Sequence, residues 1–356
     1  MQKAVRRLWL GAVCSAALLA QSTPPGTRVV ASTVPANGDM NPYGVAIVPV
    51  SVGDLTAGNI LVSNFNNSSN LQGTGTTIVQ ITPRGSQSLF AQIDAATLPG
   101  ACPGGIGLTT ALAVLPSGWV MVGSLPTTDG TSATAEAGCL LVLNANGNVV
   151  ETIANSSING PWDMAALQLG DDAFLFVTNV LNGTVAGGGN VVNEGTVLRI
   201  ALELHADAAP TVKSMTTIGS GFAERTDPNA LVIGPTGLGL AFDGTLYVAD
   251  SLNNRIAAIP NALTAQNSAG TGKTVKEGRN LNDPLGLAID FFGDVLTVNG
   301  NNGFLVVTTA RGDSLGEALL DSSGTPPGSG ALFGLAVSDR GIYYVDDATN
   351  TLNIFL

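Results

Sequence analysis

Short runs of alternating apolar and polar residues fill the chain after its first twenty positions, where apolar residues at helical spacing are absent. An alternation with a period of two is typical of β-strands that bury one face. Six segments share one pattern, in which a proline or small residue and a glycine are followed by alternating apolar residues. They span residues 41–46, 107–113, 160–165, 234–241, 283–288 and 331–336. Such self-similarity predicts a repeat architecture.

Each repeat continues with further strand-like runs. The second runs span residues 59–64, 118–123, 174–179, 244–250, 294–299 and 341–346. The third runs span residues 77–81, 139–143, 196–200, 255–259, 303–308 and 351–356. Fourth runs are weaker, for example at 87–92, 148–153 and 211–218. Six repeats of four antiparallel strands predict an all-β fold, a six-bladed β-propeller.

The last repeat contains only three strand-like runs, whereas a further run at residues 27–32 precedes the first repeat. We expect this N-terminal strand to complete the last blade, because it would cover an edge that is otherwise free to pair with other chains. The sequence therefore predicts one propeller over residues 21–356, with blades that start near 41, 107, 160, 234, 283 and 331.

The fourth repeat carries the most complete motif. It reads Gly-Pro-Thr-Gly-Leu at 234–238, Asp-Gly-Thr-Leu-Tyr-Val-Ala-Asp at 243–250 and Asn-Asn-Arg-Ile at 253–256. This pattern resembles the NHL repeat, and weaker versions of it extend over residues 41–356. The resemblance implies a six-bladed propeller in which Asp250 and Arg255 pair across a turn and stabilise the blade.

The N-terminus has the composition of a secretory signal peptide. Lys3, Arg6 and Arg7 precede an apolar run at 8–20, and polar residues follow. The run of about 13 residues is too short to span a bilayer comfortably. We expect cleavage after Ala20, export to the periplasm or the medium and no transmembrane segment in the mature chain; a lipoprotein anchor at Cys14 is the alternative.

Charge narrows the classes of partner. The chain has 14 basic and 26 acidic side chains, a formal charge of −12, and loss of the first twenty residues would leave 11 basic side chains and a charge of −15. Nucleic acids and anionic membranes attract basic surfaces. The sequence therefore predicts no nucleic-acid partner.

The long insertions predict a binding face. Three of them follow second strands, at 64–76, 123–138 and 179–195, and two follow fourth strands, at 91–105 and 220–233. In an antiparallel blade these connections all lie at one end, which we term the top face. Because loops of this length are often functional, we expect an exported, non-catalytic scaffold that binds a protein or small molecule through the top face of blades one to four.

Two cysteines remain beyond the predicted signal peptide. Cys102 lies in the connection into blade two, and Cys139 opens the third strand of that blade. Both positions lie at the top end of the blade, and exported proteins commonly form disulfides. We therefore expect a Cys102–Cys139 disulfide, with two free thiols as the alternative.

The enzymatic alternative rests on a more distant resemblance to the gluconolactonase-like (SMP-30) propellers. That family holds a divalent cation such as calcium on the axis, through a glutamate, two asparagines and an aspartate, and the resemblance places Asn41, Thr110, Asn159 and Asp283 at those positions. If a metal is bound, Asn159 and Asp283 are the expected ligands. The expected glutamate is absent, however, and both residues could instead cap turns.

Few other residues suggest chemistry. His205 is the only histidine, which excludes any site that needs two imidazoles, and we predict no catalytic residue and no cofactor apart from the possible cation. Tyr43, Trp162 and Phe333 stand at blade starts, where they could line a ligand funnel or pack in the core. The candidate ligand-binding residues are Asn41, Thr110, Asn159, Trp162 and Asp283.

Overall fold

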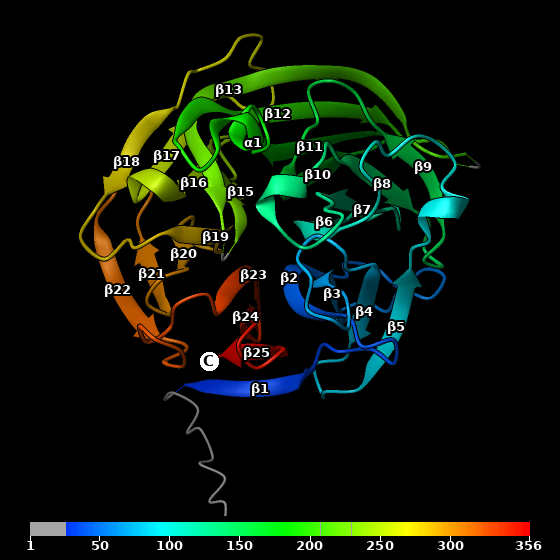
Figure 1. Ribbon diagram of the computed structural model, residues 1–356, viewed down its shortest axis with the longest axis horizontal. Helices are drawn as coiled ribbons and strands as arrows, with labels where there is room; N and C mark the ends of the chain where they lie inside the picture. The colour runs from blue at the N-terminus through cyan, green and yellow to red at the C-terminus, as the bar shows by residue number, and fades with distance from the viewer. Residues whose placement is uncertain (1–25, 207, 229) are drawn as a thin grey trace, which may run out of the picture.

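The computed structural model describes residues 26–206, 208–228 and 230–356 and arranges them as six β-sheets around a central axis (Figure 1). This is the six-bladed β-propeller that the repeats predict. The predicted signal peptide lies outside the described residues. Within the described part of the chain, no helix combines the length and apolarity that crossing a membrane requires.

The strands of the first three blades run from the axis outward in chain order. Blade one contains β2 (Met40–Ile47), β3 (Ile60–Asn66), β4 (Thr77–Ile81) and β5 (Gln87–Gln92). Blade two contains β6 (Leu108–Val114), β7 (Val120–Ser124), β8 (Cys139–Leu143) and β9 (Val149–Ile153). Blade three contains β10 (Pro161–Leu169), β11 (Asp172–Asn179), β12 (Val192–Glu203), β13 (Thr211–Asp227) and β14 (Leu231–Ile233).

The strands of the last three blades also run from the axis outward in chain order. Blade four contains β15 (Pro235–Leu240), β16 (Leu246–Asp250), β17 (Arg255–Ile259) and β18 (Lys273–Glu277). Blade five contains β19 (Pro284–Ile289), β20 (Val295–Asn299), β21 (Phe304–Thr308) and β22 (Ser314–Leu319). Blade six contains β23 (Leu332–Ser338), β24 (Gly341–Asp346) and β25 (Thr351–Phe355). Short helical turns occur in some of the connections between strands around the ring. They are η1 (Ala95–Thr97), η2 (Ser132–Thr134), α1 (Thr184–Gly187) and η3 (Ser251–Asn253).

The N-terminal strand β1 (Thr27–Ser32) closes the ring as predicted. It pairs antiparallel with β25 from Thr27 opposite Phe355 to Ser32 opposite Thr351, and becomes the outer strand of blade six. Both ends of the described chain therefore lie in one blade, and β25 has no free edge.

A repeated glycine allows the innermost strands to approach one another around the axis. A Cβ atom added to Gly286 would lie 2.0 Å from the Phe333 carbonyl oxygen, and one added to Gly334 would lie 2.2 Å from that of Tyr43. Gly237 is confined in the same way by the Leu285 carbonyl oxygen, at 2.4 Å, and Gly44 by Ser63 Oγ of its own blade and, at 3.0 Å, by the Thr110 carbonyl oxygen. The repeat thus requires glycine where the backbone of one blade touches that of the next.

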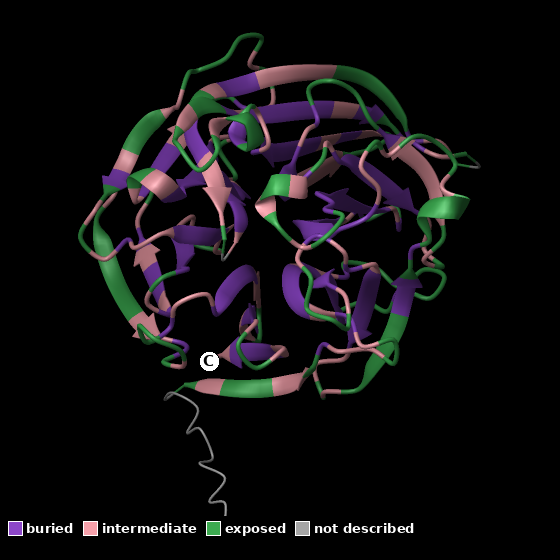
Figure 2. Ribbon diagram, in the orientation of Figure 1, coloured by how far each residue is buried: buried purple, intermediate pink, exposed green. Residues whose placement is uncertain are grey.

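The core lies between neighbouring blades. Strands such as β3, β4, β7 and β8 are buried along their whole length because other blades cover both faces of each inner sheet. Figure 2 shows that exposure is concentrated on the outer strands and the loops. Each blade is thus stabilised mainly by apolar contact with its two neighbours, as in other radial repeat folds.

The predicted pair in blade four is present. The guanidinium of Arg255 donates from Nε and Nη2 to Oδ2 of Asp250, at 2.9 and 2.7 Å, and the Asp250 side chain is fully buried. Asn253 also donates to this carboxylate. The pair joins the ends of β16 and β17, the structural role that the NHL resemblance implies.

Blade three departs from the sequence prediction. We predicted a fourth strand at 211–218 and a loop at 220–233, whereas β13 continues to Asp227 and turns back as β14, with Arg225 opposite Ile233. The end of the predicted insertion at 179–195 forms the first part of β12 and pairs with this extension of β13, since Val192 lies opposite Glu224. The glycine-rich stretch concealed this strand because it alternates small residues with a buried Phe222.

Cys102 and Cys139 form a disulfide, in agreement with the pairing expected from the sequence, and their Cα atoms lie 5.2 Å apart. The link ties the connection that precedes blade two to the buried start of β8. It closes a loop across a sequence separation of 37 residues.

We expect the double substitution Cys102→Ser and Cys139→Ser to lower the free energy of unfolding by about 3–4 kcal/mol, because the unfolded chain regains the entropy of the open loop. Urea unfolding of the native protein under oxidising and reducing conditions measures the effect. The reduced native protein should match the double variant; equal stability of all three would contradict a formed disulfide.

Candidate functional site

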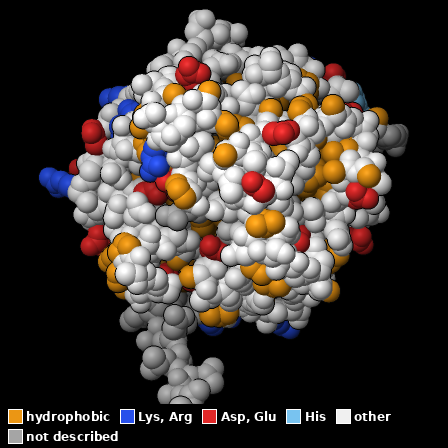
Figure 3. All heavy atoms as spheres, in the orientation of Figure 1, with side chains coloured by type: hydrophobic (Ala, Val, Ile, Leu, Met, Phe, Trp, Pro, Cys, Tyr) orange, Lys and Arg blue, Asp and Glu red, His pale blue; other side chains and the backbone are white. Residues whose placement is uncertain are grey.

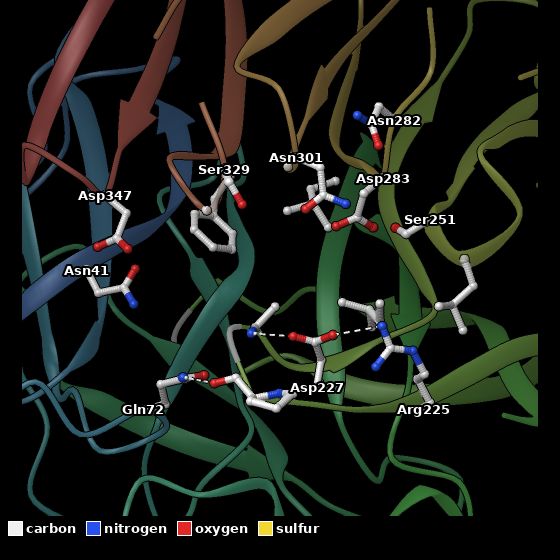
Figure 4. A pocket seen from close by; sticks show the side chains of 18 of the residues that line it. Asn41, Gln72, Arg225, Asp227, Ser251, Asn282, Asp283, Asn301, Ser329 and Asp347 are labelled. Carbon is white, nitrogen blue, oxygen red and sulfur yellow. Dashed lines mark hydrogen bonds and ion pairs between the residues drawn. The ribbon is translucent and has the colours of Figure 1, made fainter. Parts of the chain in front are cut away.

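A cavity of about 710 Å³ opens at the top of the axis, above the starts of the innermost strands of blades four, five, six and one. Figure 3 shows the face that carries α1, on which charged side chains are sparse. Figure 4 shows the cavity from close by. Its polar lining residues are Asn41, Asn66, Asn70, Gln72, Arg225, Asp227, Ser251, Asn254, Asn282, Asp283, Asn301, Thr325, Ser329 and Asp347.

Two of the predicted residues line this cavity. Asn41 and Asp283 each immediately precede the proline near the start of an innermost strand, and both have left-handed backbones, with φ of 59° and 55°. Asparagine and aspartate tolerate this conformation better than most residues. Oδ1 of each side chain is buried and has no hydrogen-bond partner among the described residues. Two acceptors therefore remain for a ligand.

Asn159 lies elsewhere because it is one residue too early in the repeat. In five blades, the residue immediately before the innermost strand accepts a hydrogen bond through its backbone carbonyl. The donor is the backbone amide of the residue that follows the second strand. The acceptors are Gly107, Gly160, Gly234, Asp283 and Ala331. Blade three therefore has Gly160 at the position of Asp283. The Asn159 amide instead donates to Asn182 Oδ1 at 2.8 Å. Thr110 lines a second cavity, farther along the axis.

The insertions of blades one to three fold against one another. Ser132 Oγ, from the blade-two insertion, hydrogen-bonds to the carbonyls of Asp227 and Leu231 on the hairpin formed by β13 and β14. The side-chain amide of Gln72, from the blade-one insertion, donates to Pro228 O at 3.0 Å, and the backbone carbonyl of Gln72 accepts a hydrogen bond from Thr127 Oγ1. The loops on which we based a broad binding face therefore engage each other over half of the ring.

Apolar residues of this hairpin cover the aromatic residues near the axis. Leu231 and Val232 belong to the same buried cluster as Tyr43 and Trp162, which are 2% and 3% exposed. Tyr43 stacks on Phe333, with ring centroids 3.9 Å apart. Of the three predicted funnel residues only Phe333 lines the upper cavity, and packing in the core accounts for Tyr43 and Trp162.

The residue after each second strand explains why the cavity lies on one side. In blades two and three these residues are Leu125 and Val180. Phe65, inside β3, occupies the equivalent position in blade one because Asn64 before it pairs with Pro42. All three belong to the buried cluster beneath the hairpin. In blades four to six they are Ser251, Gly300 and Asp347, and all three line the cavity. The sequence prediction did not consider this position, although its residue is apolar in blades one to three and polar or glycine in blades four to six.

Three carboxyl groups and one guanidinium give the cavity its charge. Asp227 forms an ion pair with Arg225, with Nη2 and Oδ2 2.9 Å apart, and accepts a hydrogen bond from the Ala230 backbone (Figure 4). Asp283 and Asp347 come from blades five and six. Three acids against one base make the cavity anionic when all of them are ionised.

Burial makes two of these acids weak. The pKa of Asp283 is raised to about 6, first by burial and then by the charge of Asp227, against the opposing effect of Arg225. The pKa of Asp347 is raised to about 7 by burial and by repulsion from Asp346. Near neutral pH these groups can accept and release protons, a property that is common in active sites.

The residues do not fit the cation set that the SMP-30 resemblance implies. Of its four positions, only Asn41 and Asp283 reach the cavity, whereas Asn159 is bonded to Asn182 and Thr110 lies in the other cavity. No group of three His, Cys, Asp or Glu side chains in the described residues is arranged to hold a metal. Calcium requires six to eight oxygen ligands, and this donor set does not supply them.

No family model matches the sequence. No curated protein matches it either.

Solved structures show the same fold at low sequence identity. A gluconolactonase from Xanthomonas campestris aligns with a TM-score of 0.55 and 13% identity, over 89% of this chain and 86% of its own. The calcium-binding protein regucalcin from Agrobacterium tumefaciens aligns with a TM-score of 0.52 and 12% identity, over 92% and 93% of the two chains. Virginiamycin B lyase from Staphylococcus aureus aligns with a TM-score of 0.51 and 13% identity, over 92% and 98%. The chain thus has the fold of the propellers that its sequence resembles, while these neighbours differ in activity.

We expect the melting temperature of the protein to be the same in EDTA as in millimolar Ca²⁺, Mn²⁺ or Zn²⁺, because the axial donors do not assemble into a cation site. Differential scanning calorimetry provides the measurement. An ion that binds the native protein and is present at a hundred times its dissociation constant would add about 2.7 kcal/mol to the free energy of unfolding. A rise with one cation that Asp283→Asn abolishes would refute this interpretation.

Proposed function

We propose that this protein is a hydrolase that opens a small, uncharged, hydroxyl-rich lactone or ester in the upper axial cavity. The observation that carries the proposal is the pair of half-buried carboxyl groups, Asp283 and Asp347, with pKa values of about 6 and 7 in one polar cavity. A base and an acid with neighbouring pKa values are what hydrolysis near neutral pH requires.

The size and polarity of the cavity support the substrate class. About 710 Å³ is within the usual range for small-molecule sites. The unpartnered acceptors Asn41 Oδ1 and Asp283 Oδ1 require donors, which substrate hydroxyl groups can provide. The excess of carboxyl groups disfavours phosphorylated or carboxylated substrates.

The protein's own residues suffice to move the protons. Asp283, as the carboxylate, takes a proton from a water molecule whose oxygen bonds to the acyl carbon. The carbon–oxygen bond of the lactone then breaks, and the leaving oxygen takes a proton from Asp347. Arg225, held by Asp227, provides positive charge to the cavity in which negative charge develops on the acyl oxygen.

The comparisons give modest support to a hydrolase. One structural neighbour is described as a gluconolactonase, and a sugar lactone belongs to the substrate class inferred from the cavity. The predicted non-catalytic scaffold has less support, because the insertions of blades one to three are engaged with one another rather than free. Export of the protein, which its N-terminus predicts, would place this activity outside the cytoplasm.

We expect a bell-shaped dependence of kcat/KM on pH for glucono-δ-lactone, with its maximum between about pH 6 and 7. Activity rises as pH passes about 6, because Asp283 loses its proton and becomes a base. It falls as pH passes about 7, because Asp347 loses the proton that it donates. Initial rates above the spontaneous reaction, followed in a pH-stat, give the profile.

Substitutions assign the two limbs of this profile. Asp283→Asn and Asp347→Asn should each lower kcat/KM by about 10²–10⁴-fold, the usual contribution of a general acid or base, and Asp347→Asn should also remove the alkaline limb. Glu317→Gln, which removes an exposed carboxylate from β22 of blade five, is the matched control and should leave the rate unchanged. Hydrolysis that is insensitive to both aspartate substitutions, or no hydrolysis of lactone or p-nitrophenyl acetate above background, would refute the proposal.

A further inference from the structure

A second cavity of about 230 Å³ lies on the axis, farther along the innermost strands than the aromatic stack of Tyr43 and Phe333. All six innermost strands contribute to it, mostly through aliphatic side chains or glycine. Its exceptions are Thr110 and Asp163. The described residues that line it include no lysine, arginine or histidine. This cavity is therefore an apolar chamber with one acidic group, and it shares no residue with the upper cavity.

Asp163 breaks the glycine rule of the propeller. Blades one, four, five and six have glycine two residues after the last residue that pairs before the register shift of the innermost strand, where the strands touch around the axis. In the register of β10, this position in blade three is Asp163, which lies two residues after Pro161 just as Gly237 lies two residues after Pro235. Blade two has one more residue between its paired positions, Leu108 and Leu112, so that Ala111 stands immediately before Leu112 and Thr110 one residue earlier. Blade three thus has a carboxyl group where four other blades have glycine, and Thr110 of the neighbouring blade two lines the same cavity.

Asp163 is a buried carboxyl group that has no basic partner among the described residues. It is 8% exposed, and its two oxygens accept hydrogen bonds from the backbone amides of Met164 and Leu238, at 2.8 and 2.9 Å. Burial raises its pKa to about 7. Two neutral amide donors only partly compensate a buried negative charge, so the carboxylate would gain from a cation in the cavity beside it.

Thr110 supplies an independent indication of a ligand. Its side chain is 3% exposed, and its Oγ1 has no hydrogen-bond partner among the described residues although it lines the same cavity as Asp163. A buried hydroxyl without a partner is unfavourable. A donor placed between the two blades could bond to both side chains.

The surroundings decide which kind of cation fits. A metal ion such as calcium needs six to eight oxygen ligands, whereas this chamber offers two polar side chains among aliphatic walls such as Leu112, Leu238 and Leu287. The cation must therefore carry its own apolar body. The volume of about 230 Å³ can accommodate a short alkyl chain.

Aromatic residues extend the apolar surface beyond the chamber. Leu240 and Ile289 line it and lie two residues before Phe242 and Phe291 in the turns that follow β15 and β19. Phe242, Phe291 and the adjacent Phe292 are 85%, 64% and 90% exposed. Exposed phenylalanines on neighbouring blades are unusual for a surface without a binding role.

We propose that the lower axial cavity binds a primary alkylammonium ion. The ammonium group donates to Asp163 and Thr110, and the alkyl chain lies along the leucine-lined wall toward Leu240 and Ile289. An ammonium has three donors and no acceptor, which matches two acceptor side chains in a chamber without a basic group. This site is separate from the hydrolase site and does not depend on the function proposed for it.

Isothermal titration calorimetry with hexylammonium chloride tests the proposal, with hexanol and sodium hexanoate as probes of the same chain length. We expect hexylammonium to bind at least about tenfold more tightly than hexanol, a difference of about 1.4 kcal/mol, and hexanoate to give no binding heat. Asp163→Asn should weaken hexylammonium binding by about tenfold or more, and Thr110→Val should weaken it less. Asp283→Asn, in the upper cavity, should leave it unchanged.

Two further variants keep the result interpretable. Asp163→Gly restores the residue found in four other blades and should fold even where Asp163→Asn does not, because the fold already accepts glycine there. Leu240→Trp fills the apolar wall without touching the carboxyl group and should also abolish binding. No binding heat with the native protein at millimolar hexylammonium, equal affinity for hexanol, or undiminished binding by Asp163→Gly would overturn the proposal.

Discussion

The constraint on which the structure depends is that six innermost strands must share one axis. Their backbones approach so closely that a Cβ atom at Gly286 or Gly334 would overlap a carbonyl oxygen of the next blade. Glycine is therefore a steric requirement where the backbones of two blades touch, as in blades four, five and six. This contact separates the two axial cavities. Residues just before it in the innermost strands line the upper cavity, and residues just after it line the lower one.

The upper end of the axis is divided into an apolar half and a polar half. On blades one to three, Leu231 and Val232 of the β13–β14 hairpin cover apolar residues such as Leu125 and Val180. On blades four to six, Ser251 and Asp347 occupy the equivalent positions and line the cavity. The insertions therefore restrict the open part of the axis to the side where the acids lie. Burial on that side weakens the acids enough for them to exchange protons near neutral pH.

The fold could be predicted from the sequence because its pattern is repeated six times and each copy carries a glycine near its start, followed by the same alternation. The closing strand and the Asp250–Arg255 pair followed from the same pattern. The SMP-30 resemblance placed Asn41 and Asp283 at the axis, and both line the upper cavity. Asn159 was placed by analogy to an Asn-Gly segment, and one residue of register removed it from the cavity.

The path of the insertions could not be predicted. Whether residues 220–233 form a loop or a hairpin depends on pairing with Val192 and on burial of Phe222 and Leu231, which are contacts between distant segments. The roles of Arg225 and Asp227 depend on that hairpin. Asp347, by contrast, stands at a repeat position that can be read from the sequence once the residue after each second strand is compared.

The most direct test of the account is a crystal structure of the protein soaked with gluconolactam, a lactone analogue in which an amide replaces the hydrolysable ester. The account predicts a ligand in the upper axial cavity, with hydroxyl groups that donate to Asn41 Oδ1 and Asp283 Oδ1. An empty upper cavity at saturating ligand, or a ligand bound over the blade-one to blade-three insertions instead, would contradict it.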